Sequence, residues 1–398
     1  VELARRLKEP APGRVQVLTG PRQVGKTHLL RTIERRWRAR AIYAAADAPA
    51  AALPGWWEAQ WQAAEVLAKR HGAVVLLVDE VQYVPEWGRR LKSSYDRVAH
   101  LRTPIHVVVS GSSSLRIGQG TRESLAGRFE HLTLLHWPPA ELVRQLKVDR
   151  DTAAGVAARF GTYPGAVRYL GDKGRWASYV RDSIVEPAIG RDIMAMEVIR
   201  KPALLRQVFA LALGHPAEIV SLQKLQGALS EAGAIETIAH YLNVLEQAYL
   251  VVGVQKFARQ AVRRRAAPPK LVVLAQGTLG ALAGGAVGSP DSDRKCWGRW
   301  VENACIALAW NAGQHVTYWR QEPLEVDMVL SGSWGRWAVE VTTRDYTGRD
   351  LAGVLRFCDA NPEFRPLVVC EAGSEGLARA AGVACCSWQA FLMDGPPR

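Results

Sequence analysis

The sequence predicts a protein of the α/β class, with a parallel β-sheet wrapped by helices in the first third of the chain. Short apolar runs of strand length alternate there with helical patterns, which is typical of a parallel sheet. A helix-strand-strand-strand pattern resumes in the last third, beyond residue 290. The length of 398 residues predicts two or three domains, at roughly 150 residues for each domain.

Five strands are expected in the first domain, which we place at residues 1–140. The runs are Val15–Thr19, Ala41–Ala45, Val74–Val78, Ile105–Ser110 and His131–Leu135. One strand separates the first run from Val74–Val78 along the chain. We therefore expect these two strands not to be immediate neighbours in the sheet.

A helical lid or connector is expected at residues 141–214. Its last helix carries apolar residues at helical spacing, which are Leu204, Leu205, Val208 and Leu211. The Gly-, Ala- and Pro-rich segment Gly280–Pro290 is typical of a linker. We place the last domain, a second α/β domain, at residues 281–398.

Residues 215–280 are expected to form a helix-turn-helix followed by a wing. One short helix begins at Ser221, a second spans Ile235–Gln247, and Tyr249–Val254 is extended. In DNA-binding versions the second helix enters the major groove, and its exposed residues here would be Glu236, Thr237, His240 and Asn243. The basic residues beyond the wing, which could contact phosphates, are Arg259, Arg263, Arg264 and Arg265. A protein-interaction or subunit-packing role is the alternative.

The strongest motif is a full G-x-x-x-x-G-K-[ST] match between a predicted strand and a predicted helix. It consists of Gly20, Pro21, Arg22, Gln23, Val24, Gly25, Lys26 and Thr27. The glycines let backbone N–H groups close around phosphate oxygens, the lysine ammonium contacts the β and γ phosphates, and the threonine hydroxyl binds Mg²⁺. These residues, with the adjoining His28, predict binding of ATP with Mg²⁺.

Two carboxylates follow the run Val74–Val78, at Asp79 and Glu80. We expect Asp79 to hold Mg²⁺ through its water shell and Glu80 to polarise the attacking water as a general base. An acidic helix cap after a buried strand is the alternative. With Lys26 nearby, the pair predicts an enzyme that hydrolyses ATP.

Four stretches of the chain carry a family resemblance. They are LTGPRQVGKTHLL, LLVDEVQYVPEWGRRLKSSYD, VVVSGSSSL and ESLAGRFEHLTLLHW. They resemble the AAA-type predicted ATPases of bacteria and archaea that carry a carboxyl-terminal domain of unknown function, and the resemblance spans nearly the whole chain. It implies a P-loop ATPase core, a helical lid, a winged helix and a restriction-endonuclease-like tail.

Further nucleotide contacts are expected around the sheet edge. The strand Ile105–Ser110 runs into a serine-rich loop at the edge where ligands bind in such folds, so Ser112 is a candidate γ-phosphate sensor, with a polar turn as the alternative. The resemblance implies an arginine finger at Arg128, within Leu-Ala-Gly-Arg, acting in cis or across a subunit boundary. The alternative is a surface ion pair with Glu123 or Glu130.

The segment Phe160–Gly165 contains a Gly-x-x-Pro turn. It resembles the turn that approaches the adenine side of the nucleotide in related ATPases. The resemblance therefore makes Pro164 a candidate nucleotide contact.

The last domain carries carboxylates at three suggestive places, Glu302, Asp327 and Glu340. In restriction-type nucleases an Asp and a Glu on adjacent strands bind a divalent metal, and a Lys two residues after the Glu assists the attacking water. Here that position is Thr342, which supplies no positive charge, and the guanidinium of Arg344 is a poor proton acceptor. We therefore expect a degenerate site that binds a partner or nucleic acid without cleavage; an ATP-coupled DNA nuclease is the alternative.

Composition favours an anionic partner, because the formal net charge is +13. DNA, a protein partner and a second copy of the chain all remain open on this ground. No apolar run is long enough to cross a membrane, and Val1-Glu2-Leu3 lacks a signal-peptide pattern, so we expect a cytoplasmic protein. We interpret the chain as an ATP-driven switch that engages a target; an ATP-sensing DNA-binding regulator without turnover is the alternative.

Overall fold

The computed structural model describes residues 2–111, 125–194, 199–229, 234–258, 267–282 and 293–397. The chain divides into two compact units, Val1–Leu135 and His136–Arg398. The first unit thus ends at Leu135 rather than at the predicted residue 140, and the finer division of the second unit stays a prediction. In the ranges just given, no helix is long and apolar enough to cross a bilayer.

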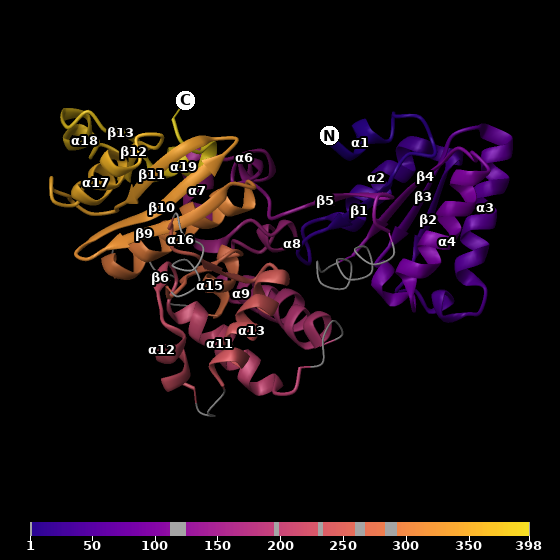
Figure 1. Ribbon diagram of the computed structural model, residues 1–398, viewed down its shortest axis with the longest axis horizontal. Coiled ribbons are helices and arrows are strands. Elements are labelled where there is room, and N and C mark those ends of the chain that lie inside the picture. Colours follow the sequence, from indigo (N-terminus) through magenta and orange to yellow (C-terminus); the bar gives the residue numbers. More distant parts are fainter. Residues whose placement is uncertain are drawn as a thin grey trace. The chain divides into compact units, whose positions relative to one another are not determined.

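The first unit contains a five-stranded parallel sheet in the order β2-β3-β4-β1-β5 (Figure 1). The strands are β1 (Val15–Thr19), β2 (Ala41–Ala45), β3 (Val74–Asp79), β4 (Ile105–Ser110) and β5 (Phe129–Thr133). All five predicted strands are confirmed, although β5 starts at Phe129 rather than at His131. Because β4 lies between β1 and β3, the expectation that these two are not neighbours is also confirmed.

Helices cover both faces of this sheet. On one face α1 (Glu2–Arg6) and α2 (Lys26–Trp37) pack through buried leucines against β1, β3 and β4. On the other face α3 (Trp56–His71) and α4 (Trp87–His100) do the same with tryptophans and Leu91. Short helical turns lie at η1 (Arg38–Arg40), η2 (Pro49–Ala52) and η3 (Val81–Tyr83). Every residue of β1, β3 and β4 is buried, which explains why their sequences are mainly apolar.

The second unit opens with a helical region, as predicted for residues 141–214. Its elements are α6 (Ala140–Leu146), α7 (Arg150–Phe160), α8 (Pro164–Val167), α9 (Lys173–Val180), the π-helical η4 (Arg181–Val185) and η5 (Ala188–Ile193), and α11 (Pro202–Gly214). Leu204, Leu205 and Val208 are buried along α11, while Leu211 is half-buried.

A three-stranded antiparallel sheet follows, in the order β6-β8-β7. The elements in chain order are β6 (Glu218–Ile219), α12 (Leu222–Gly227), α13 (Ile235–Gln247), β7 (Val251–Val254) and β8 (Lys270–Val273). Helix α12 begins after Ser221, whose hydroxyl accepts a hydrogen bond from the Lys224 N–H at 3.1 Å. Two helices are followed by paired strands in this region, and the assignment of a helix-turn-helix with a wing stays a prediction.

The predicted linker Gly280–Pro290 needs a correction at its start, because α15 (Gln276–Leu282) continues through Gly280. Gly280 is buried there, and a Cβ at this position would lie 2.6 Å from the carbonyl oxygen of Arg159. A glycine thus serves close helix packing rather than chain flexibility. Residues 283–290 lie outside the described residues, as do the basic cluster Arg259, Arg263, Arg264 and Arg265.

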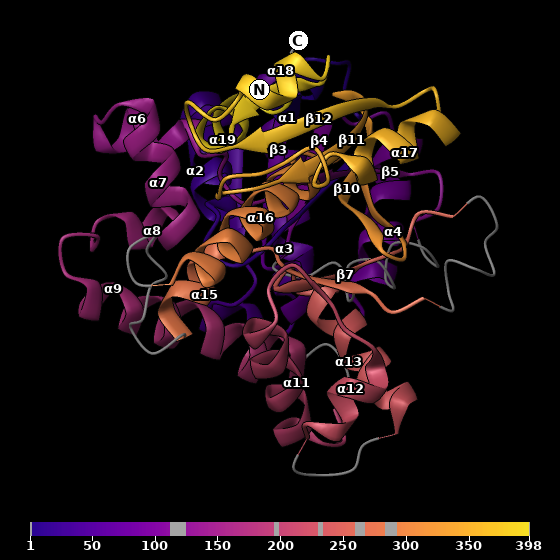
Figure 2. The ribbon, with the colours of Figure 1, turned by 90° about the vertical axis from the view of Figure 1, so that its left-hand side faces the viewer.

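The remaining residues form a mixed five-stranded sheet in the order β13-β12-β11-β10-β9. The elements are α16 (Arg294–Asn311), β9 (His315–Gln321), β10 (Leu324–Gly332), β11 (Gly335–Val341), α17 (Ala352–Ala360), β12 (Arg365–Cys370), α18 (Gly376–Ala380), β13 (Ala384–Ser387) and α19 (Trp388–Asp394). Helix α16 lies against one face of the sheet (Figure 2), and α17 packs on the other. The predicted helix-strand-strand-strand order is confirmed, whereas the restriction-endonuclease-like assignment stays a prediction.

Candidate functional site

The glycine-rich loop between β1 and α2 requires its two glycines for different reasons. Gly20 has a φ of +148°, and a Cβ there would lie 2.0 Å from the carbonyl oxygen of Leu134. Gly25 has a φ of +101° and caps the amino-terminal end of α2. Both are backbone conformations that L side chains rarely adopt, so the loop can form only with glycine at these places.

Lys26 is the first residue of α2 and is only 5% exposed. Its ammonium donates hydrogen bonds to the carbonyl oxygens of Gly20 at 2.9 Å and Pro21 at 2.7 Å. The charge is therefore held inside the curve of the loop. Thr27 and His28 follow on the exposed side of the first helical turn, where free backbone N–H groups favour an anion.

Asp79 ends β3 and is 2% exposed. One carboxylate oxygen accepts a hydrogen bond from the Tyr43 hydroxyl at 2.8 Å, and the other accepts one from the Ser110 hydroxyl. Burial and the neighbouring Asp79 raise the pKa of Tyr43, so the phenol stays a proton donor. The guanidinium of Arg31 lies 3.4 Å from the centre of the Tyr43 ring. Two hydroxyls thus fix the orientation of the Asp79 carboxylate.

Glu80 follows directly, with a left-handed backbone conformation at a φ of 53°. Its carboxylate accepts a hydrogen bond from the Gln82 side-chain amide. Glu80, Lys26 and Thr27 line one cleft of ≈ 660 Å³. The other lining residues are Arg22, Gln23, Gly25, His28, Arg31, Glu34 and Arg35. The structure therefore brings the phosphate loop and the predicted general base to the same space.

Arg128 does not fit a role in cis. It precedes β5, and its carbonyl oxygen accepts a hydrogen bond from the N–H of Val15, at the start of β1. Because β1 and β5 are parallel, Arg128 lies at the amino end of the sheet and the phosphate loop at the carboxyl end, separated by a five-residue strand of about 16 Å. Its guanidinium instead forms a two-pronged ion pair with Asp96, at 2.6 and 3.2 Å.

The alternative ion-pair partners predicted for Arg128 also need correction. Glu130 pairs with Arg6 at 3.2 Å and with Arg14 at 3.8 Å, while Glu123 lies outside the described residues. Ser112 lies outside them too, so its role as a γ-phosphate sensor stays a prediction. Of the serine-rich loop, Ser110 is described, and it binds Asp79.

Pro164 begins α8 in the second unit, and its contact with a nucleotide stays a prediction. The turn before it is rigid and packed. Gly161 has a φ of +69°, and a Cβ there would lie 2.4 Å from the backbone nitrogen of Gly277. Gly161 and Tyr163 also line an apolar cavity of ≈ 240 Å³ in that unit.

The carboxylates predicted for the last domain do come together, but around a lysine. The ammonium of Lys270, on β8, lies 2.6 Å from a Glu302 carboxylate oxygen and 3.3 Å from an Asp327 carboxylate oxygen. Glu340 belongs to the same charged cluster, because Asp327, Glu302 and burial all raise the pKa of its carboxyl, burial most of all. Thr342 is not in the cluster: its hydroxyl donates to the Arg344 carbonyl oxygen at 3.3 Å. Of the four residues predicted for this site, Thr342 is therefore the one that the structure places outside the cluster.

Three contacts are not predicted from the sequence. They are the hydrogen bonds that Tyr43 and Ser110 donate to Asp79, and the place of Lys270 among the carboxylates. Tyr43 sits in an ordinary apolar strand, and nothing in its sequence indicates that its hydroxyl reaches β3. Lys270 does leave a signal, since it opens the otherwise apolar run Lys-Leu-Val-Val-Leu. A charged residue at the start of a buried strand requires a partner, but the partner's identity depends on tertiary structure.

Comparisons with known proteins match a family model to the part of the chain that carries this site. Residues 12–143 match the family model of an AAA domain, and residues 157–287 and 297–391 match two models of domains of unknown function. Two uncharacterized proteins, of Mycobacterium bovis and Mycobacterium tuberculosis, are each 26% identical over 360 residues, which is 88% of this chain and 75% of theirs.

Similar solved structures include the Aeropyrum pernix ORC1 protein in complex with DNA and a Thermotoga maritima RuvB. The first is 15% identical and covers 72% of this chain and 90% of its own, with a TM-score of 0.33. The second is 17% identical and covers 64% and 87%, also with a TM-score of 0.33. Similarity at that level carries no inference about function. The AAA-domain match covers the part of the chain that contains the glycine-rich loop, Asp79 and Glu80: residues 12–143 are an AAA-type P-loop ATPase domain, followed by two domains of unknown function.

Proposed function

We propose that the first unit binds ATP with Mg²⁺ and hydrolyses it. One observation carries the proposal: the loop lysine Lys26, the threonine Thr27 and the carboxylate of Glu80 line the same cleft. A triphosphate requires a backbone cradle with a cation, and hydrolysis requires a base close to the γ-phosphate. The start of α2 supplies Lys26 and Thr27, and the end of β3 leads into Glu80.

The residues present fit Mg²⁺. Thr27 offers a hydroxyl at the helix start, and Asp79 offers a carboxylate oriented by two donors; oxygen ligands of this kind suit the ion. When bound, Mg²⁺ would neutralise phosphate charge. Lys26 would give up its carbonyl partners for phosphate oxygens, and Glu80 would turn from Gln82 to accept a proton from the attacking water.

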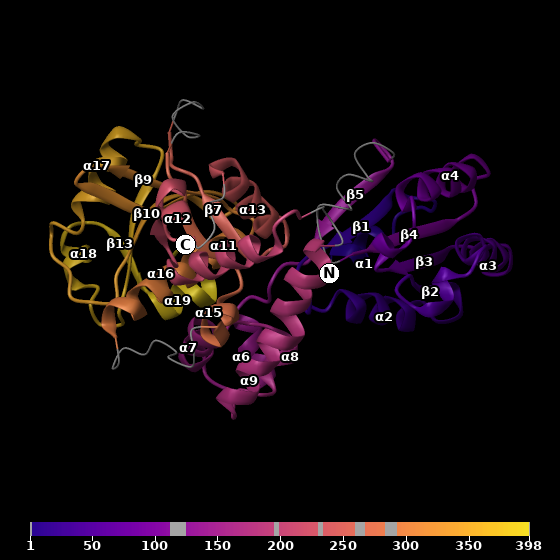
Figure 3. The same cartoon turned by 90° about the horizontal axis from the view of Figure 1, so that it is seen from below.

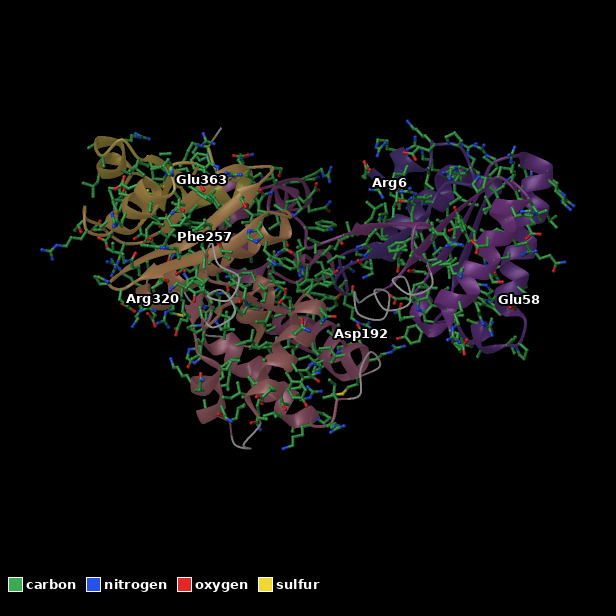
Figure 4. All side chains as sticks on the ribbon, viewed as in Figure 1. Arg6, Glu58, Asp192, Phe257, Arg320 and Glu363 are labelled. Atoms are coloured by element: carbon green, nitrogen blue, oxygen red, sulfur yellow. The ribbon has the colours of Figure 1, made fainter. Side chains whose placement is uncertain are left out.

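Two substitutions separate binding from turnover. We expect Lys26→Ala to abolish ATP binding in a Mg²⁺-containing titration, and Glu80→Gln to retain binding while ATP turnover falls by at least a hundredfold. Matched controls on the same unit are Lys92→Ala on α4 and Glu58→Gln on α3, the latter marked in Figure 4; both residues are exposed. Binding without turnover in the wild-type chain would instead favour an ATP-sensing protein.

The second unit would engage the target of this switch. On α13, Glu236 and Asn243 are exposed and Ile238 is buried, so the outward face is available to a partner. That helix contains no lysine or arginine, which favours a protein partner over the major groove of DNA. The ATPase assay with and without duplex DNA at two salt concentrations discriminates these, because stimulation that fades with salt identifies phosphate contacts.

Arg128 has a role in this proposal only across a subunit boundary. Its place at the amino end of β5 excludes its own phosphate loop, yet its half-exposed guanidinium is accessible to a second copy of the chain. The ion pair with Asp96 would have to open.

A further inference from the structure

A buried lysine stands at the centre of the carboxylate cluster in the second unit. Lys270 is 1% exposed, and its ammonium has four oxygen neighbours from two other elements. They are Glu302 Oε1 at 2.6 Å, Glu325 Oε1 at 3.1 Å, the Asp327 backbone oxygen at 3.2 Å and Asp327 Oδ1 at 3.3 Å. An ammonium surrounded in this way is fully paired.

The carboxylates themselves are locked in place around the ammonium. The second Asp327 oxygen accepts a hydrogen bond from the Val341 N–H at 2.9 Å, so β11 orients it. Glu325 also contacts Arg320, at 3.9 Å on the outer side, and Arg320 is marked in Figure 4. One Glu340 oxygen is buried and lies without a hydrogen-bond partner. Four carboxylates thus converge where one full cation is buried.

The electrostatics keep that cation charged. Burial alone would lower the pKa of Lys270, but the charges of Glu302, Asp327 and Glu325 outweigh it and raise the pKa. On the acidic side, burial and the charge of Asp327 raise the pKa of Glu302 to about 8, against the opposite effect of Lys270. The carboxyl groups therefore repel one another when they are ionised, and the ammonium is the cation that offsets this repulsion.

These residues do not fit a nuclease metal. A divalent ion needs carboxylate oxygens at roughly 2.0–2.6 Å, and the space between Glu302 and Asp327 already holds an ammonium that would repel it. Among the residues that the structure describes, no group of three or more His, Cys, Asp or Glu side chains is arranged to hold a metal. The lysine is also too deeply buried to meet a DNA backbone.

The lysine comes from a different part of the chain than the carboxylates. It lies on β8, in the three-stranded sheet, whereas Glu302 lies on α16 and Asp327 on β10. Other contacts join the same parts: the Asn303 side chain exchanges two hydrogen bonds of 2.9 Å with the Val273 backbone. Phe257, marked in Figure 4, donates its N–H to the Tyr318 carbonyl at 2.6 Å.

We propose that the Lys270 ammonium is the permanent internal cation of this site, standing where a nuclease would bind its metal. The carboxyl-terminal domain accordingly does not cleave nucleic acid. Its carboxylate cluster instead forms buried ion pairs with Lys270 that hold β8 against α16 and β10. This inference goes beyond the proposed ATPase and does not depend on it.

The test asks whether removing the ammonium opens a metal site. Mn²⁺ binding to the full-length, nucleotide-free chain is measured by electron paramagnetic resonance for the wild type, Lys270→Met and the control Lys295→Met, an exposed lysine on α16. We expect Lys270→Met to gain one Mn²⁺ site, with at least a tenfold rise in affinity over the other two chains. Any Mn²⁺ at Thr27 and Asp79 is common to all three.

A stability measurement covers the case in which Lys270→Met folds poorly. We expect that substitution to lower the Tm of the second unit by roughly 10 °C, because it leaves buried carboxylates without a counterion. Adding Glu302→Gln removes one ionisable carboxyl group from the cluster and should restore part of the lost stability. Failure of Glu302→Gln to restore any stability would contradict the proposal.

Two further results would overturn it. One is evidence of a metal site in the wild-type chain. This evidence would be either Mn²⁺ binding that Asp327→Asn abolishes or Mg²⁺-dependent DNA cleavage that Asp327→Ala abolishes. The other is a folded Lys270→Met chain that shows neither new Mn²⁺ binding nor a lower Tm. Neither result bears on nucleotide binding at Lys26, so the two proposals fail independently.

Discussion

At the residue scale, the orientation of Asp79 depends on two hydroxyls that its own strand does not supply. Tyr43 comes from β2 and Ser110 from β4, the strands on either side of β3. An ionised carboxylate accepts hydrogen bonds on both oxygens, so the two donors set its direction without changing its charge. Outer groups of this kind tune how well a ligand holds its metal.

We therefore expect Tyr43→Phe to raise the Mg²⁺ concentration for half-maximal ATP hydrolysis by about tenfold, with little change in Mg²⁺-free nucleotide binding. A Mg²⁺ titration of the ATPase rate measures this. The matched control is Tyr95→Phe, which removes a hydroxyl that donates to the Gly13 carbonyl at 2.9 Å, away from the cleft. Identical Mg²⁺ curves for the two variants would contradict the interpretation.

At the element scale, the two ends of β1 and β5 separate two kinds of residue. The carboxyl ends carry the phosphate loop, and the amino ends carry Arg128 with its partner Asp96 on α4. If Arg128 and the phosphate loop act on the same nucleotide, the amino end of one sheet must lie next to the carboxyl end of another sheet. Only a second subunit can satisfy that geometry.

A mixing experiment tests this arrangement. Arg128→Ala and Glu80→Gln should each be inactive alone, because one lacks the finger that it gives its neighbour and the other lacks its base. Mixed together, Glu80→Gln subunits would supply an arginine to the intact cleft of Arg128→Ala subunits, and ATP turnover should return to roughly a quarter to a half of wild type. Mixed assemblies that form but stay inactive would rule out the shared site.

Sequence patterns predict the elements better than the contacts between them. The bounds of β1 and β4 agree with the apolar runs because strands buried on both faces are mainly hydrophobic. The bounds of β2, a half-buried edge strand, also agree. The glycine-rich loop is predicted equally well, because all of its residues are consecutive in the sequence. In contrast, the pairing of Arg128 with Asp96 and of Lys270 with Glu302 joins residues 32 positions apart, and no local pattern encodes such a choice.

At the scale of the whole molecule, the two units differ in what stabilises them. The first gains stability from whatever binds its cleft. The second contains Glu302, whose pKa is raised from 4.5 to about 8, mainly by burial. Between those values Glu302 holds its proton in the folded unit but not in the unfolded chain, so the contribution of Glu302 to stability is fully present below pH 4.5 and is lost as the pH rises toward 8.

Calorimetry should resolve these two responses. We expect two unfolding transitions, of which Mg²⁺ with ATP raises one, by about 2.7 kcal/mol of stability at a hundred times the Kd. Raising the pH from 6 to 8.5 should lower the Tm of the other by several degrees, and Glu302→Gln should flatten that slope. Glu363→Gln, an exposed residue marked in Figure 4, should leave it unchanged; an unaltered slope in Glu302→Gln would refute the assignment.

The contact between Gly20 and Leu134 has a mechanical consequence. Leu134 donates its N–H to the Thr19 carbonyl at 2.8 Å. It directly follows β5, the strand labelled in Figure 3, and lies one residue before the end of the first unit. The segment at Leu134, where the chain leaves the first unit, therefore packs directly against the glycine-rich loop that would bind phosphate. We therefore expect any rearrangement of that loop on a bound anion to act directly on the segment that follows Leu134.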